Sequence, residues 1–384
     1  ISWIISDEGF FPKIAWMSSM RLRGALGSSG VQPGPNDALR TFAVATTNVL
    51  GSEVAGLRSS LLGNPTLKPE RAQELEFGTD LRLFSDRINV ELTFYDKSSR
   101  DALIAQTVAP SAGSAATSVL ANLGEVRNWG YETLINAQLL SRRAVAWDLT
   151  VSASRNSNEL VSLGTDAAGK AIPPIIGTST QQRPGFPLNG YWQRNFTYAD
   201  ANSDGIIVPS EVTIADSITF QGYSQPRLEL TFVNGFDLFN RRLRISSLID
   251  HKSGFKVLNS EQQFLCQQSL SCKATSSHDA TLFEQARAIA QRFKTPQTTA
   301  GYMEDVRFTR IREVSATYNV TSSVARRYLK AESLGLVFAV RNLAIFSDWT
   351  GVDPEQNYGE GNLQSTLLTA GPPRYFTMRV NLRY

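Results

Sequence analysis

The sharpest chemical motif in this sequence is an acidic twelve-residue segment, DANSDGIIVPSE, at positions 200–211. Oxygen-bearing side chains recur at alternate positions and the segment ends on a glutamate, which is the spacing of a calcium-binding loop. Gly205 stands where such a loop turns sharply. The spacing predicts ligands from the side chains of Asp200, Asn202, Asp204 and Glu211 and from the backbone carbonyl of Ile206. We therefore expect a structural Ca²⁺ site here.

A plain polar turn is the alternative interpretation of the same segment. Asp, Asn and Gly are also the residues that ordinary turns favour. Pro209 stands where a flanking helix would begin, and the sequence around the segment shows no obvious helical pattern. Both interpretations place the segment in an irregular connection.

The two cysteines, Cys266 and Cys272, are the second candidate for chemistry. An even pair in an exported protein favours a disulfide, here closing a small ring. Free thiols or a redox motif are the alternatives, but the spacing is not Cys-x-x-Cys. We expect a structural disulfide.

A catalytic set is not evident in the sequence. The chain has two histidines, His251 and His278, and neither has an obvious nucleophile partner. The Gly-x-Ser-x-Gly and His-Glu-x-x-His motifs are absent. We therefore expect a protein that is not an enzyme.

Bulk composition excludes some classes of protein. The formal net charge is +3 over 384 residues, which gives no reason to expect a nucleic-acid partner. A run of about 18 apolar residues, the mark of a membrane-spanning helix, is missing. The chain begins ISWIIS without a secretion signal, so we interpret it as a segment of a longer exported protein.

The dominant pattern along the chain is alternation of apolar and polar residues, which predicts β-strands with two different faces. It is clearest in the last residues of the chain. One face there would carry Phe376, Met378, Val380, Leu382 and Tyr384. The other face would carry Tyr375, Thr377, Arg379, Asn381 and Arg383.

About eleven candidate strands of roughly ten residues can be counted, and ten residues is the length that a tilted strand needs to cross a bilayer. Besides the C-terminal one, the alternating segments lie at 20–26, 75–83, 88–95, 129–139, 147–154, 228–236, 243–249, 314–320 and 334–340. The pattern predicts an all-β fold, an antiparallel transmembrane β-barrel segment.

The connections between these strands alternate in length. Tight links occur near Ser85, Ser141 and Asn240, and intermediate ones at 7–17 and 320–333. Long links are predicted at about 30–70, 100–127, 160–225, 253–304 and 347–373. Bacterial barrels have short periplasmic turns and long extracellular loops, so we expect the five long links outside the cell. A soluble β-sandwich is the alternative, but sandwich strands are usually joined by short links at both ends.

Four stretches resemble the SusC/RagA-type family of TonB-dependent transporters. They are MSSMRLRGALGSSG at 17–30, NPTLKPERAQELEFGTDLRLFSDRINVELTFYDKSSRDALI at 64–104, VRFTRIREVSATYNV at 306–320 and VRNLAIFSDWTGVDPEQN at 340–357. The fourth stretch carries Asn342, Asp353, Pro354 and Glu355 in the expected order. The resemblance extends over the whole chain.

This resemblance implies a 22-stranded barrel in the outer membrane of a Gram-negative bacterium, with about eleven strands here as its second half. The plug and the region that contacts TonB would lie outside this chain. The implied activity is TonB-dependent import of a bulky solute, an oligosaccharide or a peptide, with a SusD-like surface lipoprotein as partner. An outer-membrane binding or adhesion barrel without transport is the alternative.

Three aromatic residues in the predicted long loops are candidates for solute contact. Tyr191, Trp192 and Trp349 could stack on a solute, whereas aromatic residues nearer the strand ends could form the interfacial girdle of a barrel. Ordinary core packing is the alternative for the aromatic residues near the strand ends. A helix is also expected at 279–293, capped by Asp279, with a role in loop packing.

Overall fold

The computed structural model describes residues 1–107, 118–122, 124–165, 169–277, 279–356, 366–367 and 370–384. His278 and parts of the predicted loops at 100–127, 160–225 and 347–373 lie outside these residues. No helix among the described residues is both long and apolar enough to cross a membrane.

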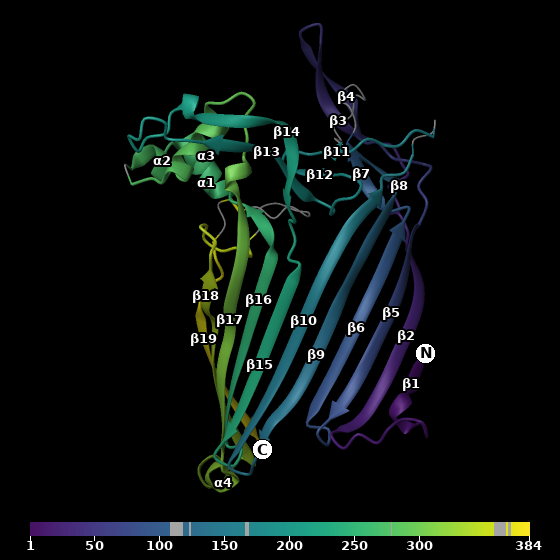
Figure 1. The fold of residues 1–384 in the computed structure, drawn as a ribbon, viewed down its shortest axis with the longest axis vertical. Coiled ribbons are helices and arrows are strands. Elements are labelled where there is room, and N and C mark those ends of the chain that lie inside the picture. Colours follow the sequence, from purple (N-terminus) through teal and green to yellow (C-terminus); the bar gives the residue numbers. More distant parts are fainter. Residues whose placement is uncertain (108–117, 123, 166–168, 278, 357–365, 368–369) are drawn as a thin grey trace.

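One antiparallel sheet of eleven strands forms the body of the molecule (Figure 1). Its order along the sheet is β1-β2-β5-β6-β9-β10-β15-β16-β17-β18-β19, so neighbours in the sheet follow one another in the chain apart from the inserted short strands. The sheet strands are β1 Ser2–Ile4, β2 Met17–Val31, β5 Glu70–Leu83, β6 Ile88–Arg100, β9 Glu125–Ser141, β10 Val145–Ser162, β15 Leu228–Leu238, β16 Leu243–Leu258, β17 Met303–Val320, β18 Ser333–Ser347 and β19 Tyr375–Arg383. The predicted all-β fold is confirmed.

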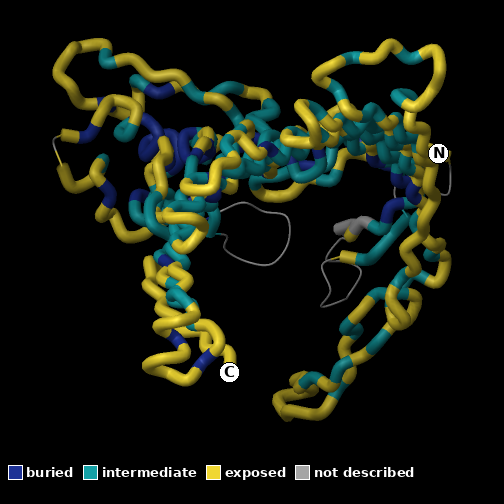
Figure 2. Tube along the Cα trace, turned by 90° about the horizontal axis from the view of Figure 1, so that it is seen from below, coloured by how far each residue is buried: buried dark blue, intermediate teal, exposed yellow. Residues whose placement is uncertain are grey.

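The sheet is curved and open. In the view from below, the chain bends around an open side instead of closing into a ring (Figure 2). Strands β1 and β19 each pair with a single neighbour in this sheet and form its two edges.

One face of the sheet is apolar, because the alternation of each strand is kept in register with its neighbours. Phe94 lies opposite both Phe77 and Tyr131, and its ring centroid is 5.3 Å from that of Tyr131. At the other end of the sheet, Phe338 lies opposite Met378. Phe94 is half-buried and the others are exposed, Tyr131 to 61% and Met378 to 74%. A continuous exposed apolar surface of this kind is suited to lipid.

The opposite face is polar and is crossed by ion pairs between strands. Asp80 pairs with Arg23 at 2.9 Å, and Lys97 pairs with Glu74 at 3.6 Å. Arg244 joins two carboxylates, Asp148 at 2.8 Å and Asp237 at 3.0 Å. Opposite charges at facing positions of adjacent strands stabilise the register of the sheet.

The links at one end of the sheet are short, as predicted (Figure 1, bottom). Strands β5 and β6 are joined through residues 84–87, β9 and β10 through 142–144, and β15 and β16 through 239–242. The intermediate links contain short helices, η1 Ile5–Asp7 between β1 and β2 and α4 Ser322–Leu329 between β17 and β18.

The links at the other end are long and carry structure of their own (Figure 1, top). Two hairpins project there, β3 Thr41–Val49 with β4 Ser52–Leu61 and β7 Leu103–Thr107 with β8 Ser118–Asn122. The link between β10 and β15 forms a second, four-stranded sheet of β11 Ile175–Ile176, β12 Thr180–Gln182, β13 Gly190–Tyr198 and β14 Val212–Gly222, with a short helix η3 at Pro209–Glu211. The link between β16 and β17 is helical, with α1 Ser260–Phe264, η4 Leu265–Ser269, α2 Lys273–Ser276, α3 Leu282–Arg292 and η5 Ala300–Tyr302.

The predicted helix at 279–293 is confirmed as α3, but its predicted cap was wrong. Thr281 is the N-cap and its hydroxyl accepts a hydrogen bond from the backbone N–H of Glu284 at 3.2 Å. The Glu284 carboxylate in turn accepts from the N–H of Thr281 at 2.8 Å. This reciprocal capping box satisfies two amides, which Asp279 lies too far upstream to do.

Candidate functional site: the polar end of the sheet and its long connections

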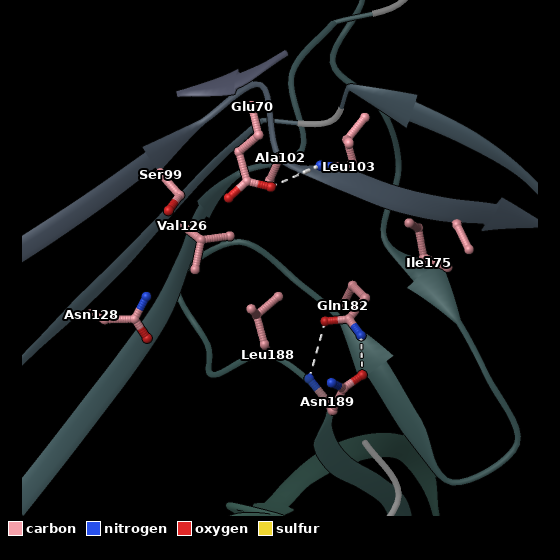
Figure 3. A pocket seen from close by; sticks show the side chains of 11 residues that line it. Glu70, Ser99, Ala102, Leu103, Val126, Asn128, Ile175, Gln182, Leu188 and Asn189 are labelled. Atoms are coloured by element: carbon pink, nitrogen blue, oxygen red, sulfur yellow. Dashed lines mark hydrogen bonds between the residues drawn. The ribbon is translucent and has the colours of Figure 1, made fainter. Parts of the chain in front are cut away.

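A cavity of about 500 Å³ lies where the polar face of the sheet meets the long connections (Figure 3). Glu70, Ser99, Val126 and Asn128 come from the ends of the sheet strands β5, β6 and β9. The remaining wall comes from the connections and consists of Ala102, Leu103, Ala105, Ile175, Gln182, Leu188 and Asn189. A solute in this cavity would therefore touch both the strands of the sheet and the long connections that cover its end.

Hydrogen-bonding groups of the cavity are held by one another and by backbone. The backbone N–H of Asn189 donates to Gln182 Oε1 at 3.1 Å, and Gln182 Nε2 donates to Asn189 Oδ1 (Figure 3). Glu70 Oε2 accepts from the backbone N–H of Leu103 at 3.4 Å. The lining residues thus offer three carboxamides, one hydroxyl and one carboxylate among aliphatic side chains. Such a lining suits recognition of an uncharged polar solute through donors and acceptors.

Nucleophilic or general-base chemistry is not a property of this lining. Its eleven residues include no His, Cys, Lys or Tyr, and Ser99 has no base among them apart from the carboxylate of Glu70. A nucleophile with an adjacent, oriented base is what covalent catalysis requires. The described lining thus offers hydrogen-bonding groups and no nucleophile with an oriented base.

The three aromatic residues predicted to contact solute are buried in the connections. Tyr191 is 1% exposed, Trp192 5% and Trp349 8%. The Tyr191 hydroxyl accepts a hydrogen bond from the backbone N–H of Leu258 at 3.3 Å, and burial raises the pKa of its phenol. A stacking platform needs an open ring face. These positions favour a role in packing, and the predicted solute contact stays untested.

The ring of Trp192 is covered on several sides. Its centroid is 4.7 Å from that of Phe186 and 5.6 Å from that of Phe220, and the guanidinium of Arg183 lies 4.4 Å from it. Trp349 belongs to a separate cluster with Phe255, Val257, Val306 and Phe308, at the ends of β16 and β17. The aromatic residues therefore hold the second sheet and the last connection in place.

The acidic segment 200–211 forms the predicted sharp turn between β13 and β14. Gly205 has a positive φ of 77°. The carboxylate of Asp200 accepts from the backbone N–H of Gly205 at 2.9 Å, and that of Asp204 accepts from the N–H of Ile206 at 2.8 Å. Glu211 reaches back to the N–H groups of Ala201 at 2.8 Å and Val208 at 3.0 Å. The segment is ordered by its own side chains.

The same carboxylates do not converge into a metal-holding cluster. Within the described residues, no group of three or more His, Cys, Asp or Glu side chains is arranged to hold a metal ion. The two flanking elements are strands, so the helices that usually frame a calcium loop are missing around this one. Each carboxylate nevertheless has about four lone-pair sites. Accepting hydrogen bonds from one or two amide groups leaves some of these sites free for a cation. Ca²⁺ binding therefore stays a prediction.

The predicted disulfide between Cys266 and Cys272 is confirmed. Both residues are 3% exposed and pack in one apolar cluster with Tyr191, Leu258 and Tyr302. The bond closes the turn between η4 and α2, so it stiffens the helical connection beside the second sheet.

A buried ion network, which the sequence did not reveal as a network, fixes the last connection. Arg310 in β17 donates to both carboxylate oxygens of Asp353, at 2.7 Å and 2.6 Å, and its Nε lies 2.9 Å from Glu355. The Arg310 and Asp353 side chains are 4% and 6% exposed. Arg312 joins Glu355 to Asp250, whose carboxylate it contacts twice at 2.7 Å. This network gives a physical reason for the Asp-Pro-Glu motif at 353–355.

The chain also matches a known protein family. Residues 2–259 match the family described as TonB dependent receptor-like, beta-barrel. The chain belongs to this family. The curated relatives include TonB-dependent receptor P3 of Formosa agariphila, 24% identical across 100% of this chain and 41% of the relative. TonB-dependent receptor SusC of Bacteroides thetaiotaomicron is 21% identical across 94% of this chain and 37% of the relative.

Solved structures agree on the fold. The RagAB peptide importer in its closed-closed state covers 99% of this receptor chain with a TM-score of 0.79 and 18% identity, and the chain spans 42% of that structure. The resemblance to SusC/RagA-type receptors is therefore confirmed, and so is a location in the outer membrane of a Gram-negative bacterium. The chain spans about two fifths of the length of these relatives.

Proposed function

We propose that this chain forms part of the wall and cover of a TonB-dependent importer for a bulky solute, an oligosaccharide or a peptide. The observation that carries the proposal is the cavity on the polar face, roofed by long connections and lined with carboxamides. Family membership supports it. Contact with TonB is expected through a region outside these 384 residues.

Gene deletion tests the transport itself. Cells lacking the whole receptor are expected to lose growth on either a defined oligosaccharide mixture or a peptide digest as sole carbon source, and deletion of TonB should reproduce the defect. Unchanged growth of the receptor deletion on both nutrients, with binding of the nutrient retained at the cell surface of the wild type, would instead favour the binding or adhesion barrel.

The cavity can be tested by two matched substitutions in one strand. Asn128 and Asn136 both belong to β9 and point to the same face, but only Asn128 lines the cavity. Asn128→Ala is expected to weaken solute uptake, whereas Asn136→Ala is expected to leave it unchanged. Equal uptake by the two variants would remove the cavity from the transport path while leaving the importer assignment intact.

The proposed partner is a SusD-like surface lipoprotein, and the hairpin of β3 and β4 is its proposed contact. Val44 lies opposite Leu57, and Phe42 is on the same face. The three side chains are 77%, 73% and 60% exposed. An isolated two-stranded hairpin is marginally stable in water, and a cluster of exposed apolar side chains indicates an interaction surface.

Co-purification from the native outer membrane tests this contact. A tagged receptor with Phe42→Ser and Leu57→Ser should recover less of the lipoprotein than the wild type. Ala43→Ser, on the other face of β3, is the matched control and should recover as much as the wild type. Undiminished recovery with the double variant would exclude the hairpin as the contact.

We also propose that segment 200–211 binds Ca²⁺ as a structural ion. Titration of the chelator-treated receptor with Ca²⁺ should then release heat and raise its thermal stability, and Asp204→Asn with Glu211→Gln should abolish both effects. Asp216→Asn removes an exposed carboxylate outside the segment and should change neither. A receptor that shows no heat and no stabilisation at millimolar Ca²⁺ would identify the segment as a plain polar turn.

A further inference from the structure

Three neighbouring turns at the short-link end carry an unusual concentration of positive charge. They comprise residues 142–144, 239–242 and 321–332. Their cations are Arg142, Arg143, Arg241, Arg242, Arg326, Arg327 and Lys330, all exposed, and we call this set the basic strip. Glu332 is the one carboxylate within the three turns.

The basic strip is not neutralised by ion pairs. Glu332 lies 3.5 Å from Arg383, outside the strip. Among the described residues, none of the seven cations has an ion-pair partner. With seven cations and one carboxylate, the three turns carry a larger positive charge than the whole chain, whose net charge is +3. The remainder of the chain is therefore net negative. The positive charge is therefore localised.

The three turns lie side by side at the short-link end of the sheet. The strands that they join, β9 to β10, β15 to β16 and β17 to β18, are consecutive in the sheet. Neighbouring turns are two strand spacings apart, about 10 Å. The backbone N–H of Asn319, just before α4, donates to the carbonyl of Arg242 at 2.7 Å. The three turns lie together around α4 (Figure 1), so their cations are neighbours at this end of the sheet.

The basic strip begins where the apolar face ends. Trp147 and Phe236 stack on the apolar face near these turns, with ring centroids 5.4 Å apart. Beyond them lie Phe239, 67% exposed, and Tyr328, 71% exposed and within 5.6 Å of the Arg327 guanidinium. Aromatic residues mark the level of lipid headgroups in membrane barrels. Cations just beyond that level lie at the depth of lipid phosphates.

The other two turns at this end lack the same charge. Residues 84–87 contain one Asp and one Arg, and residues 5–16 contain Asp7, Glu8 and one lysine. The basic strip is therefore a feature of three turns and not of the whole rim.

We propose that the basic strip binds the phosphate groups of anionic phospholipids in the leaflet that surrounds the short-link end. Charge complementarity and continuity with the lipid-facing surface select this occupant. Each cation held near an anionic lipid surface contributes roughly a fivefold gain in binding. The strip would hold a small set of lipids against one sector of the barrel wall.

Native mass spectrometry of the whole purified receptor tests the proposal. Phosphatidylglycerol should bind in preference to phosphatidylcholine, and added salt should weaken that preference. The variant R142Q/R143Q/R326Q/R327Q should bind phosphatidylglycerol roughly tenfold or more weakly. R40Q/R58Q, two exposed cations in the connection between β2 and β5, should bind as the wild type does.

Each result has a defined meaning. Equal phosphatidylglycerol binding by the strip variant and the wild type would overturn the proposal, as would equal binding of the two lipids by the wild type. The smaller variant R326Q/R327Q, confined to α4, serves if the fourfold variant unfolds on circular dichroism. Uptake of solute is a separate measurement, so failure of the proposed import would not affect this result.

Discussion

The two ends of the sheet are built on opposite principles. At the long-connection end, all four clusters of buried apolar residues found in the described structure are assembled, together with the disulfide and the network around Arg310. At the short-link end, short turns and the short helices η1 and α4 join the strands, and most of their side chains are exposed. The long connections are stabilised like a water-soluble protein, whereas the strands rely on their ladder and on lipid. Substitutions should therefore act differently at the two ends.

The largest expected effect comes from opening the buried ion network. Asp353→Asn leaves Arg310 partly unpaired at 4% exposure, which should cost about 3 kcal/mol locally. Hydrogen exchange of amides 348–356 in the whole receptor should accelerate accordingly. Asp348→Asn is the matched control, because Asp348 and its partner Arg307 are 63% and 68% exposed and such pairs contribute little. Similar effects of the two variants would show that burial does not govern this network.

Opening the disulfide should have the next largest effect. Replacing Cys266 and Cys272 by serine frees a small ring, which should destabilise the helical connection by about 2 kcal/mol. Limited proteolysis should then cleave between α1 and α3 more readily, while the short-link end keeps its resistance. Loss of resistance at both ends would mean that the two ends unfold together and are not stabilised independently.

A turn substitution at the short-link end should have a smaller effect. Asn240 has a φ of 56°, between Phe239 and Arg241, which also have positive φ. Asn240→Ala should cost about 1 kcal/mol, because alanine tolerates the left-handed region poorly. Asn240→Gly should be neutral or stabilising, and thermal unfolding of the two variants compares them. A larger loss than that from opening the disulfide would contradict the ranking of the two ends.

Acid should produce the smallest effect, confined to the first turn of α3. Hydrogen bonds from Thr281 hold the pKa of Glu284 below its usual value. A depressed pKa means that this carboxylate stabilises the folded state above the pKa of the unfolded chain, and that the gain is lost as the pH falls through the folded pKa. The protection factors of the amides at the start of α3, which exclude the intrinsic pH dependence of exchange, should fall on acidification in the wild type and show little pH dependence in Glu284→Gln.

The sequence predicted the eleven-stranded sheet, the wall of the molecule, better than the long connections that cover its end. Alternation such as that from Phe376 to Leu382 defines strands and their faces, because one residue of slippage would reverse the whole strand. The disulfide was also within reach, since two cysteines leave a single pairing. The short strands of the cover were not, because segments such as β11 and β12 have too few residues to show a period.

The site residues were harder to predict for a related reason. Burial of Tyr191 and Trp192 depends on contacts with Leu258 and Phe186, which come from other parts of the cover. The cavity likewise unites Glu70 with Gln182, more than a hundred positions apart. Only the family motif at 353–355 hinted at the network, and it gave no sign of its partner Arg310.

The packing of the cover has a consequence for protein engineering. Ile207, from the connection between β13 and β14, is buried against Ala286 and Ala290 of α3, which belongs to the connection between β16 and β17. Gln285 binds both the N–H of Ile207 and the carbonyl of Gly205. The two connections therefore form one packed unit, which can be exchanged between receptors only as a whole. Chimaeras that graft both together from a related receptor should keep a complete apolar core, whereas a crossover placed between them would divide it.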